Sequence, residues 1–86
     1  MEILYSPRFR RDYKKLDIET QHLTKEKLKL LLSHSSDPRL KIHKLTGGLK
    51  GYSAFSINHT YRVICKYEVD GTVRLLRVGT HDIYDV

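Results

Sequence analysis

The second half of the chain contains three short segments in which apolar and polar residues alternate. One face carries Phe55 and Ile57 in the first segment, and Val63 and Cys65 in the second. A period of two is typical of strands that bury one face and expose the other. The sequence therefore predicts three consecutive strands, over residues 54–58, 61–67 and 73–78.

The connections between these segments are short. Asn58-His59-Thr60 predicts a tight hairpin, and Asp70-Gly71 predicts the two positive-φ residues of a type I′ turn. Strands joined by such turns pair antiparallel. The second half is therefore expected to form an antiparallel sheet.

The first half predicts a strand followed by two helices. The strand covers residues 2–5 and ends at Ser6-Pro7, where Ser6 is expected to be the N-cap and Pro7 the first helical residue. The apolar stripe of this helix comprises Phe9, Tyr13 and Leu16. Asp17 is expected to cap a second helix that ends near Ser33. The predicted inward residues of the second helix are Leu23, Leu28, Leu31 and Leu32.

These elements predict an α+β fold of one domain, residues 1–86. An isolated short strand is not stable, so residues 2–5 are expected to join the same sheet. Residues 39–45 are basic and do not firmly predict a strand, and the chain is expected to turn at Gly47-Gly48. The expected architecture is two antiparallel N-terminal helices packed on a mainly antiparallel four-stranded sheet, in the order β-α-α-β-β-β.

The chain carries a formal charge of +6, from 16 Lys and Arg against 10 Asp and Glu. This excess favours a polyanion or an acidic protein as partner. The basic residues of the first helix either are only solvated or bind such a partner. They are Arg8, Arg10, Arg11, Lys14 and Lys15.

The single cysteine, Cys65, cannot form an internal disulfide. Its position in a packed strand favours a reducing compartment. No segment has the pattern of a signal peptide or a membrane span. We therefore expect a cytoplasmic protein without membrane contact.

Three polar residues of the last third are predicted to come from adjacent strands: Arg62, His81 and Tyr84. Arg62 alternates with the core positions, so it should point away from the helices. The planar fork of arginine matches two phosphate oxygens, and imidazole titrates near neutrality. This combination suits the cleavage of RNA by its own 2′-hydroxyl group, which needs a base, a cation and an acid. The simpler alternatives are a solvated arginine, a histidine that only bonds a neighbour, and a tyrosine that packs the C-terminus.

The other basic residues give weaker indications. The 5 histidines are dispersed without a His-x-x-x-His pair, so no metal site is expected. Further contacts with RNA phosphates could come from four residues that are otherwise ordinary solvated charges. They are Lys50, Lys66, Arg74 and Arg77.

Four segments, in this order and spacing, resemble the RelE/ParE superfamily of bacterial toxins from type II toxin–antitoxin modules, in particular its RelE- and YafQ-like messenger RNA interferases. The segments are residues 6–16, 43–51, 61–64 and 79–84. The resemblance covers essentially the whole chain. It implies a RelE-like fold and a toxin that enters the ribosomal A site, cuts the messenger there and is neutralised by a cognate antitoxin. It also implies that no metal or organic cofactor is used.

The resemblance assigns roles to the same residues. His81 matches the general acid of the family, and Arg62 matches the arginine that holds the scissile phosphate. Tyr84 matches the C-terminal aromatic residue when a shift of one position is allowed. His43 matches a histidine of the YafQ-like members.

The general base is less clearly assigned. The basic residue that the family places on the preceding strand falls at Ser56, and the acid of the following turn falls near Thr60. Neither side chain acts as a base near neutral pH. His59, in the same turn, and His43 are therefore the candidates for the base.

Two other functions stay open. A ParE-like toxin inhibits DNA gyrase without cutting RNA, and that branch shares the fold but lacks the acid–base residues. His81 and Tyr84 therefore favour cleavage, whereas Ser56 counts slightly against it. The second alternative is an inactive relative that binds nucleic acid or an antitoxin.

Overall fold

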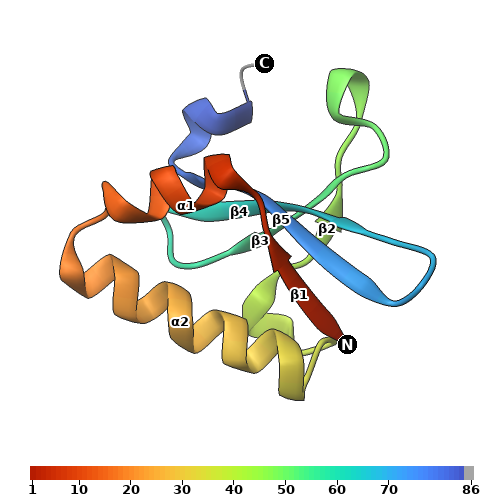
Figure 1. Cartoon of the computed structure of the whole chain (residues 1–86), viewed down its shortest axis with the longest axis horizontal. Coiled ribbons are helices and arrows are strands. Elements are labelled where there is room, and N and C mark those ends of the chain that lie inside the picture. The colour runs from red at the N-terminus through yellow and green to blue at the C-terminus, as the bar shows by residue number, and fades with distance from the viewer. Residues whose placement is uncertain (85–86) are drawn as a thin grey trace.

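The computed structural model describes residues 1–84, which form two α-helices and a five-stranded sheet (Figure 1). The elements are β1 (Glu2–Tyr5), α1 (Pro7–Lys14), α2 (Ile18–Ser33), the 3₁₀ helix η1 (Pro38–Leu40), β2 (His43–Lys44), the 3₁₀ helix η2 (Gly47–Leu49), β3 (Ser53–Ser56), β4 (Arg62–Tyr67), β5 (Thr72–Gly79) and the 3₁₀ helix η3 (His81–Tyr84). Neighbouring strands lie in the order β1-β5-β4-β3-β2. β1 is parallel to β5, and the other pairs are antiparallel. The predicted α+β fold with two N-terminal helices is confirmed.

Within residues 1–84 the sheet has one strand more than the four that the sequence predicted. The additional strand is β2, where His43 pairs with Ala54 and Lys44 with Ser53 of β3. A strand of two residues is too short to display a period of two. The sequence pattern therefore did not distinguish it from a loop.

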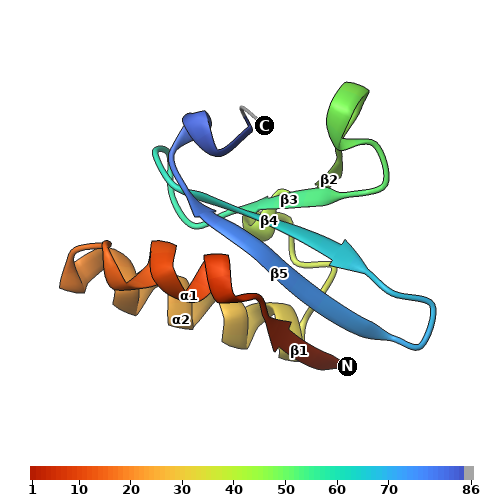
Figure 2. The same cartoon turned by 45° about the horizontal axis from the view of Figure 1, so that its top comes forward.

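Helix α1 begins where predicted and covers the edge of β5 that β1 leaves open. The hydroxyl of Ser6 caps the helix by accepting a hydrogen bond from the N–H of Phe9 at 3.0 Å. Ser6 also binds β5, since its N–H donates to the carbonyl of Leu75 and its hydroxyl to that of Leu76, both at 3.0 Å. Figure 2 shows β1 and α1 following one another along this side of the sheet. The helix thus protects backbone groups that an open strand edge would expose.

The main core lies between the helices and one face of the sheet. Asp17 caps α2 as predicted, because its carboxylate accepts hydrogen bonds from the backbone N–H and the hydroxyl of Thr20. The buried core residues are Phe9, Leu28, Leu31, Leu40, Phe55, Ile57, Val63, Cys65, Val73, Leu75 and Val78. The prediction for Leu32 was wrong, since this side chain is 52% exposed. It follows the buried Leu31 and lies about 100° further around the helix.

The two predicted hairpins have different turns. In the first, the side-chain Oδ1 of Asn58 accepts hydrogen bonds from the N–H groups of Thr60 and Tyr61 at 2.9 and 2.8 Å, which confirms a tight connection. In the second, only Gly71 has a positive φ, of 91°. The type I′ prediction was therefore wrong, because Asp70 does not take the second positive φ.

Hydrogen bonds define the turn that β4 and β5 form instead. The carbonyl of Glu68 accepts from the N–H of Gly71 at 3.1 Å, and the N–H of Glu68 donates to the carbonyl of Thr72 at 2.9 Å. The connection is a three-residue loop in which the glycine takes the left-handed position. A single glycine suffices for this turn.

The sheet face turned away from α2 is partly covered by η2 and η3. Ile64 of β4 lies on this face and is 2% exposed, and Ile83 of η3 is 3% exposed. A bulge places Ile64 opposite Arg77 and Cys65 opposite Leu75, so Leu76 is the extra residue of β5. The candidate site lies on this face.

Candidate active site

Four of the predicted site residues line one open cleft of about 520 Å³. His43 comes from β2, Arg62 from β4, and His81 and Tyr84 from η3. The 3₁₀ helix η2 and the residues before it, including Thr46 and Leu49, form another wall. Segments that are far apart in the sequence therefore meet here because β2, β3, β4 and β5 are neighbours in the sheet.

Arg62 of β4 lines this cleft. It pairs with Ser56 of β3 and Gly79 of β5, while the next residue, Val63, belongs to the core. The expectation that Arg62 points away from the helices is confirmed. Its Nε is buried and has no hydrogen-bond partner within residues 1–84. Because no carboxylate in this part of the chain forms an ion pair with it, the guanidinium is available to an anion.

Tyr84 and His81 stand beside this guanidinium. The carbon at the centre of the Arg62 guanidinium lies 5.8 Å from the centroid of the Tyr84 ring, within range of a cation–π contact. The rings of Tyr84 and His81 are 5.2 Å apart and inclined by 71°. The hydroxyl of Tyr84 is buried without a hydrogen-bond partner in residues 1–84.

His81 and Tyr84 do not come from a strand, as the sequence had suggested, but from the 3₁₀ helix η3 that follows β5. Gly79 makes this turn possible, because an added Cβ would lie 2.6 Å from Cγ2 of Ile83. The hydroxyl of Thr80 donates a short hydrogen bond to the carboxylate of Asp82. Ile83 thus packs closely on Gly79, where η3 turns back from the end of β5.

His43 lies across the cleft and is oriented by the backbone. Its Nδ1 lies 3.0 Å from the carbonyl oxygen of Lys41. A carbonyl can only accept, so Nδ1 carries the proton and, in the neutral ring, Nε2 is left as an acceptor. Lys41 reaches this position in the left-handed conformation, with φ 50° and ψ 46°. A neutral imidazole held in this way can take a proton at Nε2.

His59 is separated from these four residues. It lies in the β3–β4 hairpin and does not line the cleft with His81 and Tyr84. Instead it lines a neighbouring cleft that also includes His43 and Arg62. Of the two candidates for the base, the structure places only His43 opposite His81.

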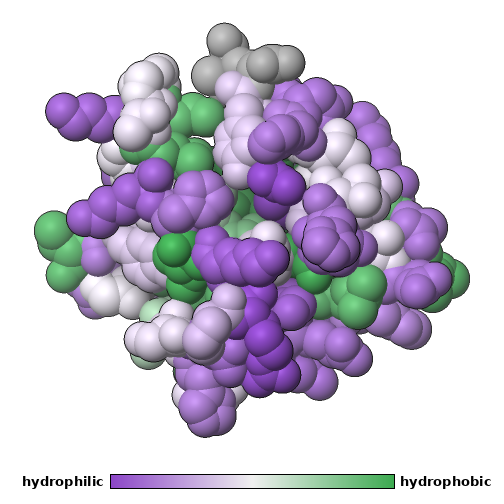
Figure 3. Space-filling model, turned by 180° about the vertical axis from the view of Figure 1, so that it is seen from behind, coloured by the Kyte–Doolittle hydropathy of each residue, from purple (hydrophilic) through white to green (hydrophobic). Residues whose placement is uncertain are grey.

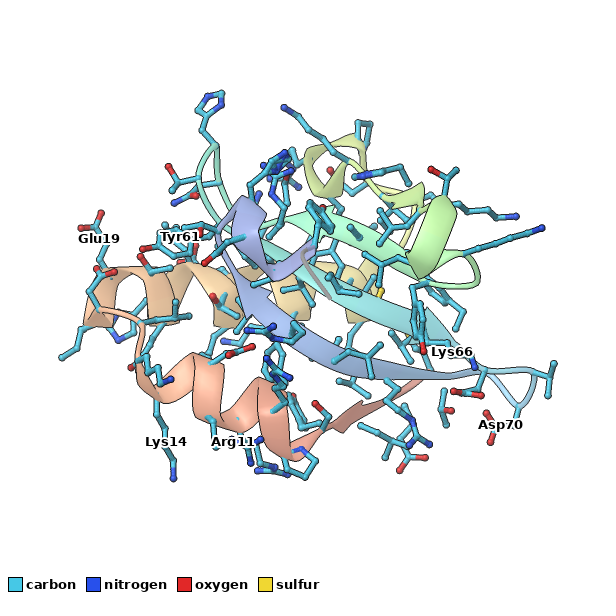
Figure 4. The ribbon with its side chains drawn as sticks, turned by 90° about the horizontal axis from the view of Figure 1, so that it is seen from above. Arg11, Lys14, Glu19, Tyr61, Lys66 and Asp70 are labelled. Atoms are coloured by element: carbon cyan, nitrogen blue, oxygen red, sulfur yellow. The ribbon has the colours of Figure 1, made fainter. Side chains whose placement is uncertain are left out.

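The four residues predicted to contact RNA phosphates also lie outside the cleft. Lys66 stands over the ring of Tyr52 at 5.7 Å, and Arg74 lies 3.8 Å from Glu68. Figure 4 shows Tyr61 and Lys66 at opposite ends of β4. Four residues of a strand span roughly 13 Å, so Lys66 is remote from Arg62. Lys50 is exposed beyond η2.

Arg77 has a structural partner instead. Its Nε donates to the carboxylate of Asp12 at 2.9 Å, and the same carboxylate accepts the N–H of Val78 at 3.1 Å. This hydrogen bond raises the pKa of Arg77 above its usual value. The ion pair joins α1 to β5, which a pattern of single residues could not indicate. By contrast, Lys14 projects from α1 away from the sheet (Figure 4).

Some kinds of site are not found in the described residues. No three His, Cys, Asp or Glu side chains of residues 1–84 gather where they could hold a metal ion. Neither α1 nor α2 is long and apolar enough to cross a membrane. Burial raises the pKa of the Cys65 thiol to about 12, so this cysteine is a core residue and not a nucleophile.

Comparison with known proteins identifies the family. A family model described as a bacterial toxin of type II toxin–antitoxin systems, YafQ, matches residues 1–84. The chain belongs to this YafQ family. The family that the sequence resembled is therefore confirmed, although no curated protein sequence matches the chain.

Solved structures agree with this assignment to the YafQ family. YafQ of E. coli strain BL21(DE3) is 25% identical, with a TM-score of 0.77 over 99% of this chain and 98% of its own. YafQ in the E. coli DinJ–YafQ toxin–antitoxin complex is 26% identical, with a TM-score of 0.74 over 99% and 97%. A chain of the YoeB–YefM complex from Staphylococcus aureus is 25% identical, with a TM-score of 0.75 over 94% and 97%.

Proposed function

We propose that this YafQ-family toxin is a ribosome-dependent endoribonuclease that cleaves messenger RNA in the A site by attack of a 2′-hydroxyl group. The observation that carries the proposal is the half-buried Arg62, whose Nε is buried and has no hydrogen-bond partner within residues 1–84, in a cleft bordered by two histidines. An anion that enters the cleft can pair with this guanidinium without displacing a carboxylate of residues 1–84. The phosphodiester group of RNA has the matching charge and geometry.

Arg62 is the residue that would hold the scissile phosphate. During attack, negative charge develops on the two non-bridging oxygens, and the guanidinium can donate to both without losing its proton. A charge placed before the reaction begins stabilises the transition state without reorganisation. The cation–π contact with Tyr84 would help to position the guanidinium, and the tyrosine ring could also orient a base of the messenger.

The two histidines are suited to opposite ends of the reaction. Nε2 of His43 would take the proton of the 2′-hydroxyl, because Nδ1 is held as a donor by the carbonyl of Lys41. The 2′-oxygen then forms a bond to phosphorus, and the bond between phosphorus and the 5′-oxygen breaks. His81 would donate a proton to that leaving oxygen. The products are a 2′,3′-cyclic phosphate and a free 5′-hydroxyl, and no step requires a metal or an organic cofactor.

The family membership also supports a protein partner. A related YafQ forms a toxin–antitoxin complex with DinJ, and we infer that this chain binds a cognate antitoxin. The net charge of +6 favours an acidic partner. Ribosome, messenger and antitoxin are cytoplasmic molecules, and we propose this location for the toxin.

Primer extension on a messenger translated in a purified system tests the proposal. The wild-type chain should produce breaks at codons in the A site. His81→Ala and Arg62→Ala should each reduce the cleavage rate by about a hundredfold to ten-thousandfold. His34→Ala is the matched control, because His34 is exposed beyond α2 and lines neither cleft.

The result can also exclude the proposal. An intact messenger combined with arrested growth would contradict cleavage and would favour inhibition of DNA gyrase. Equal loss in His81→Ala and His34→Ala would show that the effect is not specific to the cleft. An intact messenger and normal growth would indicate an inactive relative.

A further inference from the structure

A second cleft lies on the other side of the wall that His43 and Arg62 form. It has a volume of about 460 Å³, within the usual range of ligand sites. Its cationic and imidazole residues come from α2, from the segment around η1, from β2, from the β3–β4 hairpin and from β4. They are Lys27, Arg39, Lys41, His43, His59 and Arg62.

Among residues 1–84, no carboxylate lines this second cleft. Asp37 lies outside it and binds Arg39 at 3.0 and 2.9 Å, so the charge of Arg39 is already offset. Lys27, Lys41 and Arg62 form no ion pair within residues 1–84. These three positive charges therefore converge on a hollow without compensation from the described part of the chain.

Lys41 connects the two clefts. Among the described residues other than glycine it alone has a positive φ, which is uncommon for a side chain of this kind. Its carbonyl oxygen orients His43 at the first cleft, while the residue itself lines the second. Backbone strain of this kind is concentrated at functional sites.

The lining favours a nucleic acid over a protein segment. Of the described residues that line it, Ile57 alone is apolar, and it is buried in the core. An interface with a protein helix would need an exposed apolar centre. Figure 3, viewed from the side opposite α1, shows mainly hydrophilic surface through the middle of the molecule.

We propose that the second cleft binds the sugar-phosphate backbone of single-stranded RNA next to the phosphate held by Arg62. The inference rests on the proposed function, because Arg62 and His43 border both clefts. A strand whose phosphate lies on Arg62 continues over this wall and meets Lys27 and Lys41. These lysines act as point charges, so the contact is independent of sequence.

Binding of a fluorescent 2′-O-methyl RNA oligonucleotide, measured by anisotropy, tests the inference. The modified RNA lacks the attacking hydroxyl, so binding is observed without cleavage. The test variant is Lys27→Gln/Lys41→Asn, in which asparagine tolerates the left-handed backbone. The matched control is Lys25→Gln/Lys29→Gln, which removes two charges from exposed positions of α2. Circular dichroism checks that both variants are folded.

The expected effect follows from counterion release. Each phosphate contact with a single strand contributes a slope of about 0.7 to the dependence of log K on log salt. At 0.1 M salt, relative to 1 M, this slope corresponds to a factor of about 5 in affinity for each contact. Loss of two contacts should weaken binding by about 25-fold and reduce the slope by about 1.4. The control variant should change binding by less than about threefold, since only the general field is altered.

The outcomes separate this inference from the proposed function. Equal binding by the two double variants, or no binding by the wild-type chain, refutes RNA binding in the second cleft even if the wild-type chain cuts the messenger. Selective loss in Lys27→Gln/Lys41→Asn supports it even if primer extension finds no cleavage. Unchanged RNA binding with loss of an acidic protein partner would also overturn it and would assign the cleft to that partner.

Discussion

Replacement of Gly79 by alanine should displace the segment that carries His81 and Tyr84. The added Cβ would lie 2.6 Å from Cγ2 of Ile83, about 0.8 Å closer than the 3.4 Å at which ordinary contact begins. Ile83 is 3% exposed, so its methyl group cannot turn into solvent. The relief must come from a shift of η3 relative to β4, where Arg62 pairs with Gly79.

The expected effects are moderate on stability and large on cleavage. Overpacking of a core typically costs about 1–3 kcal/mol. A domain of this size has a stability of roughly 4–13 kcal/mol, so Gly79→Ala should remain folded. A displacement near 1 Å at a catalytic group can reduce the rate by roughly a hundredfold. We therefore expect about a hundredfold slower cleavage by a chain that is still folded.

Urea unfolding and primer extension measure these two effects. The double variant Gly79→Ala/Ile83→Ala provides the control, because removal of the Ile83 methyl groups makes room for the new Cβ. The stability cost of Gly79→Ala should then be smaller by about 1 kcal/mol or more in the Ile83→Ala background. An equal cost in both backgrounds, or unchanged cleavage by Gly79→Ala, would refute the steric reasoning.

Three further predictions concern the scaffold. Asp12→Ala should lower the free energy of unfolding by about 2–3 kcal/mol, because the guanidinium of Arg77 and the N–H of Val78 lose their acceptor. Asp12→Asn keeps an acceptor, so it should lower the free energy of unfolding by less. Equal losses for the two variants in urea unfolding would contradict this account. Burial raises the pKa of the Cys65 thiol from 9.0 to about 12. At pH 8 the native thiol should therefore react with iodoacetamide about a thousandfold more slowly than the thiol of the unfolded chain. Equal labelling rates of the native and the unfolded chain would contradict the shift in pKa. The thiol of the unfolded chain ionises at lower pH than the native thiol. The stability that the protonated native thiol contributes is therefore complete below pH 9 and is lost as the pH rises towards 12. Cys65→Ala should remove this component of alkaline unfolding, and an unchanged dependence of stability on pH would contradict the prediction.

The helices and long strands could be predicted because local chemistry determines them. Ser6 and Asp17 cap their helices through their own side chains, a preference that short peptides also show. Apolar and polar residues alternate around Val63 because one face of this strand is buried in the core. The two-residue strand at His43 could not be predicted, since its only reason to be extended is the pairing with β3. The turn at Asp70 was mistaken because Asp-Gly is compatible with more than one hairpin loop.

The candidate site was predictable in its chemistry and less so in its geometry. The sequence indicated Arg62, His81 and Tyr84, but not that a 3₁₀ helix brings the last two over the sheet. It could not separate His43 from His59, because only the fold shows that His43 lines both clefts whereas His59 lines only the second. The partner of Arg77 was equally hidden, since Asp12 is 65 residues away in the chain.

The parallel pairing of β1 with β5 makes the completion of the sheet depend on the synthesis of β5. Ser6 and Leu76 are 70 residues apart, so β1 stays unpaired during synthesis until the last strand has emerged. Contacts between such distant segments form late in folding because their loop-closure entropy is large. A chain that terminates early therefore lacks both the partner of its first strand and the segment that holds His81. Translation products that stop before η3 should be inert, and the proposed activity begins only after residues 72–84 have been translated.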